Sequence, residues 1–302
     1  MDPHILDRLR CPVCGEPLTE TTAGTTGALR CPRRHSFDIA RQGYVNLLAG
    51  RAPHTGDSAE MVAARADFLA AGHYDLICAA LAGAAAETVG TAPAHEAGGE
   101  APARGTERAL GTYPLVVDAG AGTGRYLGAV LAALPDAVGL ALDVSKPALR
   151  RAARAHPRAA AALADTWQRL PLADASTAVL LNVFAPRNGP EFHRVLDPAG
   201  TLLVVTPAAD HLAELVDALD LLRVDPDKAE RVAGSLGGHF TPVSSAVHRA
   251  ELTLARPDVA TLVGMGPSAW HTDRAALAAR LAALPEPVRV TVAVRLDTLR
   301  PR

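Results

Sequence analysis

The chain has 302 residues, of which 49% are hydrophobic and 21% are charged, and its formal net charge is −2. A chain of this length can bury a full core in one large domain or in two unequal domains. The small net charge excludes a polycation that binds nucleic acid over its whole surface, so any RNA contact must come from a local patch.

The N-terminus lacks the charged and then apolar pattern of a secretory signal. No apolar run approaches the roughly 18 to 20 residues that a membrane span requires. We therefore expect a cytoplasmic protein with no membrane partner.

Four candidate metal ligands lie near the N-terminus. Cys11 and Cys14 form a Cys-x2-Cys knuckle, and Cys31 and His35 follow after a spacer rich in Thr and Gly. Two such pairs can complete a tetrahedron around Zn²⁺, and four protein ligands leave no open position for water. The sequence therefore predicts one structural zinc ion in residues 1–50, a segment with too little core to fold without the metal.

Residues 51–87 predict a helical connector that packs on the domain that follows. Ser58 is a good helix N-cap, and Met61, Phe68 and Leu69 have helical spacing. A second helix starts at Tyr74, after Gly72. From residue 88 to residue 112 the composition changes to Ala, Gly, Glu, Thr and Pro, which predicts a flexible insertion.

A glycine-rich loop then follows a short apolar run at residues 115–117, which predicts a buried strand ending at Asp118. Gly120, Gly122 and Gly124 come at alternate positions, and a helix begins at residue 125. This spacing is not the Gly-x-Gly-x-x-Gly of dinucleotide-binding turns. A carboxylate beside bare backbone suits a cationic amino-acid ligand better than a pyrophosphate.

A second apolar strand at residues 138–142 ends in Asp143, whose carboxylate can accept both hydroxyls of a ribose. An ordinary glycine-rich turn with a surface aspartate is the alternative. Two strands in register, each ending in a carboxylate, favour a cofactor site over that alternative.

Two further strand ends supply candidate site residues. After a third strand at residues 160–164, Asp165 can bind an adenine amino group, while Trp167 can be either an apolar wall or a core residue. The strand at residues 178–183 includes Asn182 near its end, and Phe184 follows it directly. Ligands collect at the carboxyl ends of parallel strands, so this segment should face the transferred group.

The last part of the chain predicts the remaining strands of the same sheet. A strand at residues 201–205 precedes His211, and residues 243–254 and 288–296 read as an antiparallel pair. The alternation of strands and helices over residues 113–302 predicts an α/β fold with a Rossmann-like doubly wound sheet.

Together, Asp118, the three glycines and Asp143 resemble motifs I and II of the class I S-adenosylmethionine-dependent methyltransferases. Apart from residues 88–112, nearly the whole chain resembles the bacterial 23S ribosomal RNA (guanine-N1)-methyltransferases, which include enzymes of macrolide (tylosin-type) resistance. The matching stretches include Cys-Pro-Val-Cys at residue 11, Cys-Pro-Arg-Arg-His-Ser-Phe-Asp at 31, Gly-Tyr-Val-Asn-Leu-Leu at 43, Gly-Asp-Ser-Ala-Glu-Met at 56 and Phe-Ala-Pro at 184.

The resemblance implies a class I methyltransferase domain with an N-terminal zinc ribbon and S-adenosylmethionine as the cofactor. It implies further cofactor contacts at Tyr74, Tyr126, Leu127 and His211, and zinc at the four ligands named above. It also implies a guanine in a 23S ribosomal RNA hairpin loop as the target, and a homodimer. Guanine N1 lies on the Watson–Crick edge, so the base must be unpaired or extruded before it reacts.

Candidate RNA contacts fall in two places. Phe184 is expected to stack on the target base, with Asn182 or the Ala185 carbonyl at its edge. His211 is a candidate proton acceptor, although a cofactor contact or a helix cap suits it equally well. The ribbon is the expected RNA-reading module through its arginines, although solvated surface arginines are the alternative: Arg8, Arg10, Arg30, Arg33 and Arg34.

Two other classes of function fit parts of the pattern. A small-molecule methyltransferase with a structural zinc would keep the glycine loop and Asp143 but would not act on RNA. A non-catalytic zinc-ribbon RNA-binding protein fits less well, because Asp118, the three glycines and Asp143 are all present.

Overall fold

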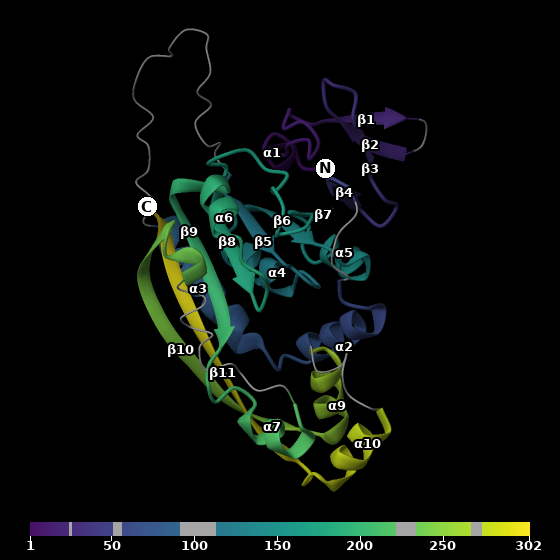
Figure 1. The fold of residues 1–302 in the computed structure, drawn as a ribbon, viewed down its shortest axis with the longest axis vertical. Helices are drawn as coiled ribbons and strands as arrows, with labels where there is room; N and C mark the ends of the chain where they lie inside the picture. The colour runs from purple at the N-terminus through teal and green to yellow at the C-terminus, as the bar shows by residue number, and fades with distance from the viewer. Residues whose placement is uncertain (24–25, 51–55, 91–112, 222–233, 267–273) are drawn as a thin grey trace.

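The computed structural model describes residues 1–23, 26–50, 56–90, 113–221, 234–266 and 274–302. Within these residues the chain forms an eight-stranded sheet covered by helices and, beside one edge of it, a small three-stranded sheet (Figure 1). Alternate residues of the strands face opposite layers. In the first parallel strand, Val116 packs into one core, whereas Leu115 and Val117 pack into the other.

The N-terminal segment forms the small sheet. After the short helix α1 (Pro3–Leu6), the strands β1 (Thr19–Ala23), β2 (Thr26–Arg30) and β3 (Ser36–Asp38) pair antiparallel in that order. The strand β4 (Tyr44–Asn46) does not join them. It pairs parallel with β7 (Ala159–Leu163) at the edge of the large sheet.

The large sheet has the strand order β10-β11-β9-β8-β5-β6-β7-β4. Strands β4 to β9 of this sheet run parallel, and β11 is antiparallel to both of its neighbours. Besides β4 and β7 they are β5 (Leu115–Ala119), β6 (Val138–Asp143), β8 (Thr177–Val183), β9 (Leu196–Pro207), β10 (Phe240–Leu254) and β11 (Val288–Pro301). The order reverses at β5, so the crevice beside its carboxyl end is the expected ligand site.

Helices cover both faces of the sheet. The face that carries Val116 is covered by α2 (Ala59–Ala70), α3 (Asp75–Gly90), α4 (Arg125–Ala133), α5 (Lys146–Ala152), α7 (Ala213–Leu219), α9 (Arg256–Gly264) and α10 (Arg274–Ala283). The opposite face packs against α6 (Gly189–Val195), α1 and the zinc-ligand segment. The predicted doubly wound α/β fold is therefore confirmed.

No single helix of the described residues is long and apolar enough to cross a membrane. The helices α2 and α3 reach the required length and composition only when taken together, across a bend of 78°.

Two predicted boundaries shift in the structure. Helix α3 ends at Gly90, so residues 88–90 belong to this helix and not to the predicted insertion, whose residues 91–112 lie outside the described residues. Residues 44–46, placed in the zinc domain by the sequence, form an edge strand of the large sheet. The two units therefore share backbone hydrogen bonds.

Arg8 anchors the N-terminal unit to the large sheet. The residue is 9% exposed, and its guanidinium donates to the carbonyl of His4 at 2.7 Å and to that of Tyr113 at 2.8 Å. The backbone beside it forms a bridge between Leu9 and Leu172. The predicted RNA contact of Arg8 is therefore wrong, because the side chain is buried and bonded to backbone carbonyls, one of which, that of Tyr113, precedes the first strand of the large sheet.

Candidate functional site

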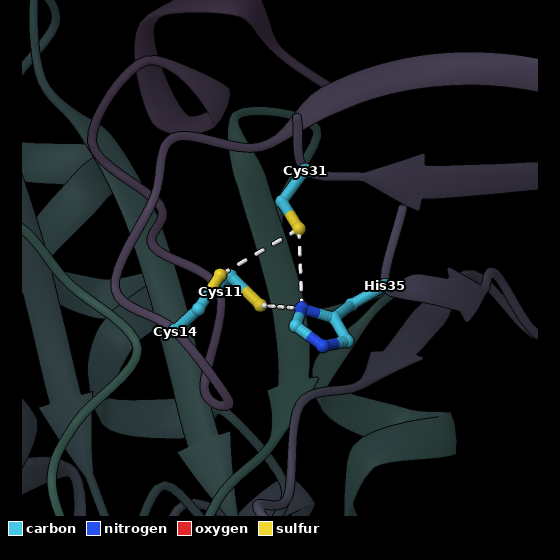
Figure 2. A group of neighbouring side chains, drawn as sticks. All are labelled: Cys11, Cys14, Cys31 and His35. Atoms are coloured by element: carbon cyan, nitrogen blue, oxygen red, sulfur yellow. Dashed lines mark hydrogen bonds between the residues drawn. The ribbon is translucent and has the colours of Figure 1, made fainter. Parts of the chain in front are cut away.

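The four predicted metal ligands meet at one point (Figure 2). Their ligand atoms all lie within 4.8 Å of one another. Cys14 Sγ is 3.7 Å from Cys31 Sγ, and His35 Nδ1 is 3.5 Å from Cys11 Sγ and 3.3 Å from Cys31 Sγ. Tetrahedral zinc with bonds of about 2.3 Å to sulfur separates two sulfur ligands by about 3.8 Å, so this cluster fits the ion closely.

Local backbone bonds hold the two ligand pairs. The Cys11 N–H donates to the Glu16 carbonyl at 2.8 Å, and the Gly15 N–H donates back to the Cys11 carbonyl at 2.8 Å, which closes the first knuckle. Gly15 has a φ of 77°, a conformation that suits a residue without Cβ. Cys11 and Cys31 are buried, and four ligands leave no open position. The site is therefore built for a structural zinc.

The outer side of the second knuckle carries two exposed arginines. Arg33 is 66% exposed in its side chain and lies 3.6 Å from Glu16, and Arg34 is exposed with a φ of 67°. Val13, at the tip of the first knuckle, is 59% exposed. The structure thus leaves the arginines available to a ligand, as the predicted RNA contact requires.

The glycine loop follows β5 and lies against the end of β6. The N–H groups of Gly120 and Ala121 donate to the Leu142 carbonyl at 2.9 and 3.0 Å, and the Gly122 N–H donates to Asp143 Oδ2 at 2.8 Å. Gly120 has a φ of 89°, and a Cβ there would lie 2.4 Å from the Cβ of Ala185. Only glycine therefore lets the loop approach the segment that carries Phe184.

Gly124 is required for helix packing. A Cβ on it would lie 2.9 Å from the Cα of Ala152, at the end of α5. The N-terminus of α4 therefore rests directly on α5, with its first amides turned towards the loop. The side chain of Leu127, predicted to touch the cofactor, is fully buried under α4. A contact at this position therefore belongs to its backbone.

Asp143 is held by two backbone donors. Its Oδ1 accepts from the Ser145 N–H at 2.7 Å, and its Oδ2 accepts from the Gly122 N–H at 2.8 Å. A carboxylate has about four acceptor sites, so each oxygen keeps a lone pair for a ribose hydroxyl. Burial raises the pKa of Asp143, and the N–H groups of Ser145 and Gly122 oppose this shift.

Asp118 is the buried carboxyl at the end of β5. It is fully buried, and within the described residues neither of its oxygens has a partner in hydrogen-bond geometry. Burial and then the nearby charge of Asp143 raise the pKa of Asp118 to about 8, and the Leu127 N–H, although outside hydrogen-bond geometry, opposes this shift. A buried carboxyl without a partner is unfavourable. This one therefore suits a cationic group of a ligand, as the ammonium of S-adenosylmethionine would supply.

Three aromatic side chains from distant parts of the chain meet near this edge of the sheet. The ring centroids of Tyr74, Phe184 and His211 lie 6.1 to 6.4 Å apart. Tyr74 is buried, whereas Phe184 is 42% exposed and has a φ of 51°. A bulky residue in the left-handed region is strained and persists only where its surroundings hold it, as happens at functional sites.

The hydrogen bonds of His211 define its tautomer. The Ala293 N–H is an obligatory donor and lies 3.2 Å from His211 Nδ1, so Nδ1 is the acceptor. The proton of the neutral ring is then on Nε2, which lies 3.4 Å from the Tyr74 hydroxyl. In this arrangement His211 donates towards Tyr74. A second proton on the ring would have to bind Nδ1, and it would break the bond from the Ala293 N–H.

Asn182 lies between the two loops of the site. Its side chain is fully buried, and its Nδ2 donates to the Ala119 carbonyl at 3.2 Å and to the Pro186 carbonyl at 2.8 Å. Its Oδ1 is buried too, with no partner in the described part of the chain. The Nδ2 group thus ties the glycine loop to the segment 184–186, and the predicted contact of Asn182 with a base depends on its Oδ1.

The segment after β7 carries Asp165 and Trp167. Asp165 is buried, and its Oδ1 accepts from the Trp167 N–H at 2.9 Å, while its Oδ2 has no partner among the described residues. That free oxygen can accept from an adenine amino group, as predicted. Trp167 is 53% exposed, so the alternative of a core residue is wrong. Tyr126 is half-buried on α4, and burial raises its pKa.

Sequence reasoning missed a third segment of the site. The hydroxyl of Ser145 donates to the Asp57 carbonyl at 2.8 Å, and a Cβ on Gly56 would lie 2.9 Å from the Ser145 N. Arg65 of α2 reaches the glycine loop from the same side, with Nη1 3.6 Å from where a Gly122 Cβ would lie. In the sequence, this segment is marked only by the stretch Gly-Asp-Ser-Ala-Glu-Met at residues 56–61. The stretch is part of the family resemblance, but its residues do not form a recognisable cofactor-binding motif.

Comparisons with known proteins agree with this geometry. Residues 9–52 match the family described as "RlmA, N-terminal", a zinc ribbon. A protein of Micromonospora griseorubida that is named for 23S rRNA (guanine-N(1)-)-methyltransferase activity is 67% identical over 301 residues, covering 100% of both chains.

Two more distant relatives carry related names. The 23S rRNA (guanine(748)-N(1))-methyltransferase of Streptomyces fradiae is 48% identical, covering 100% of this chain and 99% of its own. The Bacillus subtilis protein YxjB, named for the same guanine-N(1) activity, is 30% identical over 96% of this chain and 95% of its own. The zinc ribbon, the glycine loop and the strand order all lie within these full-length matches, and the chain therefore belongs to the 23S ribosomal RNA (guanine-N1)-methyltransferase family.

Proposed function

We propose that the protein transfers the methyl group of S-adenosylmethionine to N1 of one guanine in a 23S ribosomal RNA hairpin loop. The observation that carries this proposal is full-length identity of 67% and 48% to enzymes named for this reaction, in a chain that keeps both the zinc cluster and the cofactor loop. Guanine 748, for which the Streptomyces fradiae enzyme is named, is the first position to test. The enzyme acts in the cytoplasm as a homodimer, and its methylation of the RNA confers macrolide resistance.

The residues present divide the work between holding the cofactor and holding the base. Bound S-adenosylmethionine supplies a sulfonium methyl group for in-line displacement, so the protein mainly has to align the reacting atoms. Asp143 holds the ribose, Asp118 faces the ammonium, and Asp165 accepts from the adenine amino group. Asn182 and Gly120 keep the cofactor loop against the segment that carries Phe184, and would thereby hold the cofactor beside the base.

Phe184 is the platform for the extruded guanine. It is half exposed, lies at the carboxyl edge of β8, and its N–H is held by the Val205 carbonyl at 3.1 Å. Stacking on an aromatic ring is worth about 1 to 3 kcal/mol per base. His211 orients Tyr74 through its Nε2 proton and does not serve as the acceptor of the guanine N1 proton in this arrangement.

The direct test is methyl transfer from labelled S-adenosylmethionine to unmethylated 23S ribosomal RNA fragments, followed by primer extension. N1-methylguanine blocks base pairing, so reverse transcription should stop at one loop guanine. A fragment with that guanine replaced by adenine is the matched control and should give no stop. Cofactor binding without any RNA labelling would instead favour the small-molecule methyltransferase.

The buried Asp118 gives a prediction for cofactor affinity. Its pKa of about 8 means that the carboxyl of the free protein is protonated below that pH. Binding an ammonium requires the charged form, so binding releases a proton. The association constant for S-adenosylmethionine should therefore rise about tenfold per pH unit between about pH 5.5 and about pH 7, where the Asp118 carboxyl of the free protein and the ligand's α-amino group, with a usual pKa of about 7.7 to 8.0, both stay protonated.

Calorimetry in two buffers of different ionisation enthalpy measures the association constant and the number of protons released on binding. About one proton should be released per cofactor bound. The Asp118→Asn variant should bind more weakly and show a flat profile over the same range. A wild-type affinity that does not change with pH would contradict the assignment of Asp118 to the ammonium.

A further inference from the structure

Arg65 is a cation that the fold brings to the predicted cofactor loop from a distant helix. Its Nη1 and Cδ lie 3.6 and 3.7 Å from the position of a Cβ on Gly122. The same charge acts on three predicted cofactor residues. Burial raises the pKa of Tyr74, Tyr126 and Asp143, and the positive charge of Arg65 opposes the shift in each of them.

The guanidinium is fixed in position from two sides. Nη1 donates to Asp57 Oδ2, in the segment that packs on Ser145, and Nη2 donates to the Met265 carbonyl at 2.7 Å, just after α9. The side chain is 28% exposed. A guanidinium has five N–H donors, and these two bonds use two of them, so three have no partner among the described residues. The planar group is thus oriented in advance while keeping donors for a ligand.

The chemistry of the cofactor calls for such a group. The amino-acid end of S-adenosylmethionine carries an ammonium and a carboxylate, and the site as described offers Asp118 and Asp143 but needs a partner for the carboxylate. Arginine binds carboxylates in a planar, two-pronged geometry that lysine cannot reproduce. The other arginine beside the loop, Arg125, is turned away to Asp75, whose Oδ1 accepts from its Nη2 at 2.7 Å.

We propose that Arg65 binds the carboxylate of the amino-acid part of S-adenosylmethionine and so selects the intact cofactor. This inference rests on the proposed function, because it takes the cofactor from it. It also gives a role to segment 56–58 and to the end of α9: through Asp57 and Met265 they hold the guanidinium against the glycine loop.

S-adenosylmethionine and its decarboxylated form differ only at this carboxylate. Their affinities for the full-length protein, measured by calorimetry, therefore test the inference. Decarboxylated S-adenosylmethionine keeps the adenine, ribose, sulfonium and amine. The Arg65→Met variant should weaken S-adenosylmethionine by about 10-fold to 100-fold, the effect of losing charge-assisted bonds. It should change the affinity for the decarboxylated ligand by no more than about threefold. Arg65→Lys should bind S-adenosylmethionine with intermediate affinity.

Arg125→Met is the matched control, since it removes an arginine beside the same loop whose side chain points to Asp75, and it should leave both affinities unchanged. An equal loss of affinity for both ligands in the Arg65→Met variant would overturn the inference and make Arg65 a residue that only holds the fold. Binding of the decarboxylated ligand also reports whether the variant is folded. If the wild-type protein bound neither ligand, the proposed function itself would fail. Binding of both with no RNA methylation would leave the inference standing.

Discussion

Replacing Cys31 with serine is expected to remove zinc from the protein and to abolish RNA methylation while the cofactor still binds. Cys31 lies within 3.7 Å of two other ligand atoms and is 6% exposed. Loss of one ligand opens the coordination sphere, and small zinc domains do not hold their fold without the metal. Zinc content should fall from about one per chain to near zero, and RNA methylation by about 100-fold or more.

Cofactor affinity should change little, because Asp118 and Asp143 lie at the ends of β5 and β6, and the glycine loop follows β5. These elements belong to the large sheet and not to the zinc domain. A charge-reversed protein, Arg33→Glu with Arg34→Glu, is the matched variant: it should keep its zinc and its cofactor affinity but bind RNA about tenfold or more weakly, with a smaller dependence on salt. Calorimetry, metal analysis and RNA filter binding measure these quantities. An equal loss of cofactor and RNA binding in the Cys31→Ser variant would show that the ribbon serves only to hold the fold, which the shared strand β4 makes physically possible.

Replacing Asp143 with alanine is expected to give the largest loss of cofactor affinity. The carboxylate offers lone pairs to both ribose hydroxyls, and hydrogen bonds to a charged group contribute about 1.5 to 3 kcal/mol each. Two such bonds correspond to a loss of at least about 100-fold in binding. The same change frees the N–H groups of Gly122 and Ser145, which loosens the glycine loop.

A second aspartate separates this effect from a general loss of charge. Asp136 lies exposed in the turn between α4 and β6, and Asp136→Ala should leave the affinity unchanged. Titration of S-adenosylhomocysteine into each variant is the measurement, with thermal unfolding to confirm that Asp143→Ala is folded. An affinity within about threefold of the wild type would contradict the assignment of Asp143 to the ribose.

Several features of this protein can be recognised from short-range patterns in its amino-acid sequence. Strands that are buried on both faces, such as residues 115–117, are visible as short continuous apolar runs, because the side chains on either face enter a core. The zinc ligands follow from the spacing of two knuckles, and the glycine loop follows from residues that tolerate positive φ, as Gly120 and Gly122 do. Each of these signals lies within a few residues, so it needs no knowledge of the fold.

Contacts between distant parts of the chain could not be recognised from the sequence and become visible in the fold. β4 pairs with a strand more than a hundred residues away, and Arg8, read as a surface cation, is buried against Tyr113. The Nδ2 group of Asn182 joins two loops, and Arg65 reaches the cofactor loop from a helix that carries no motif of its own. Charge and hydrogen-bonding capacity are visible in a sequence, but what they are used for depends on which groups the packing places within about 3 Å of them.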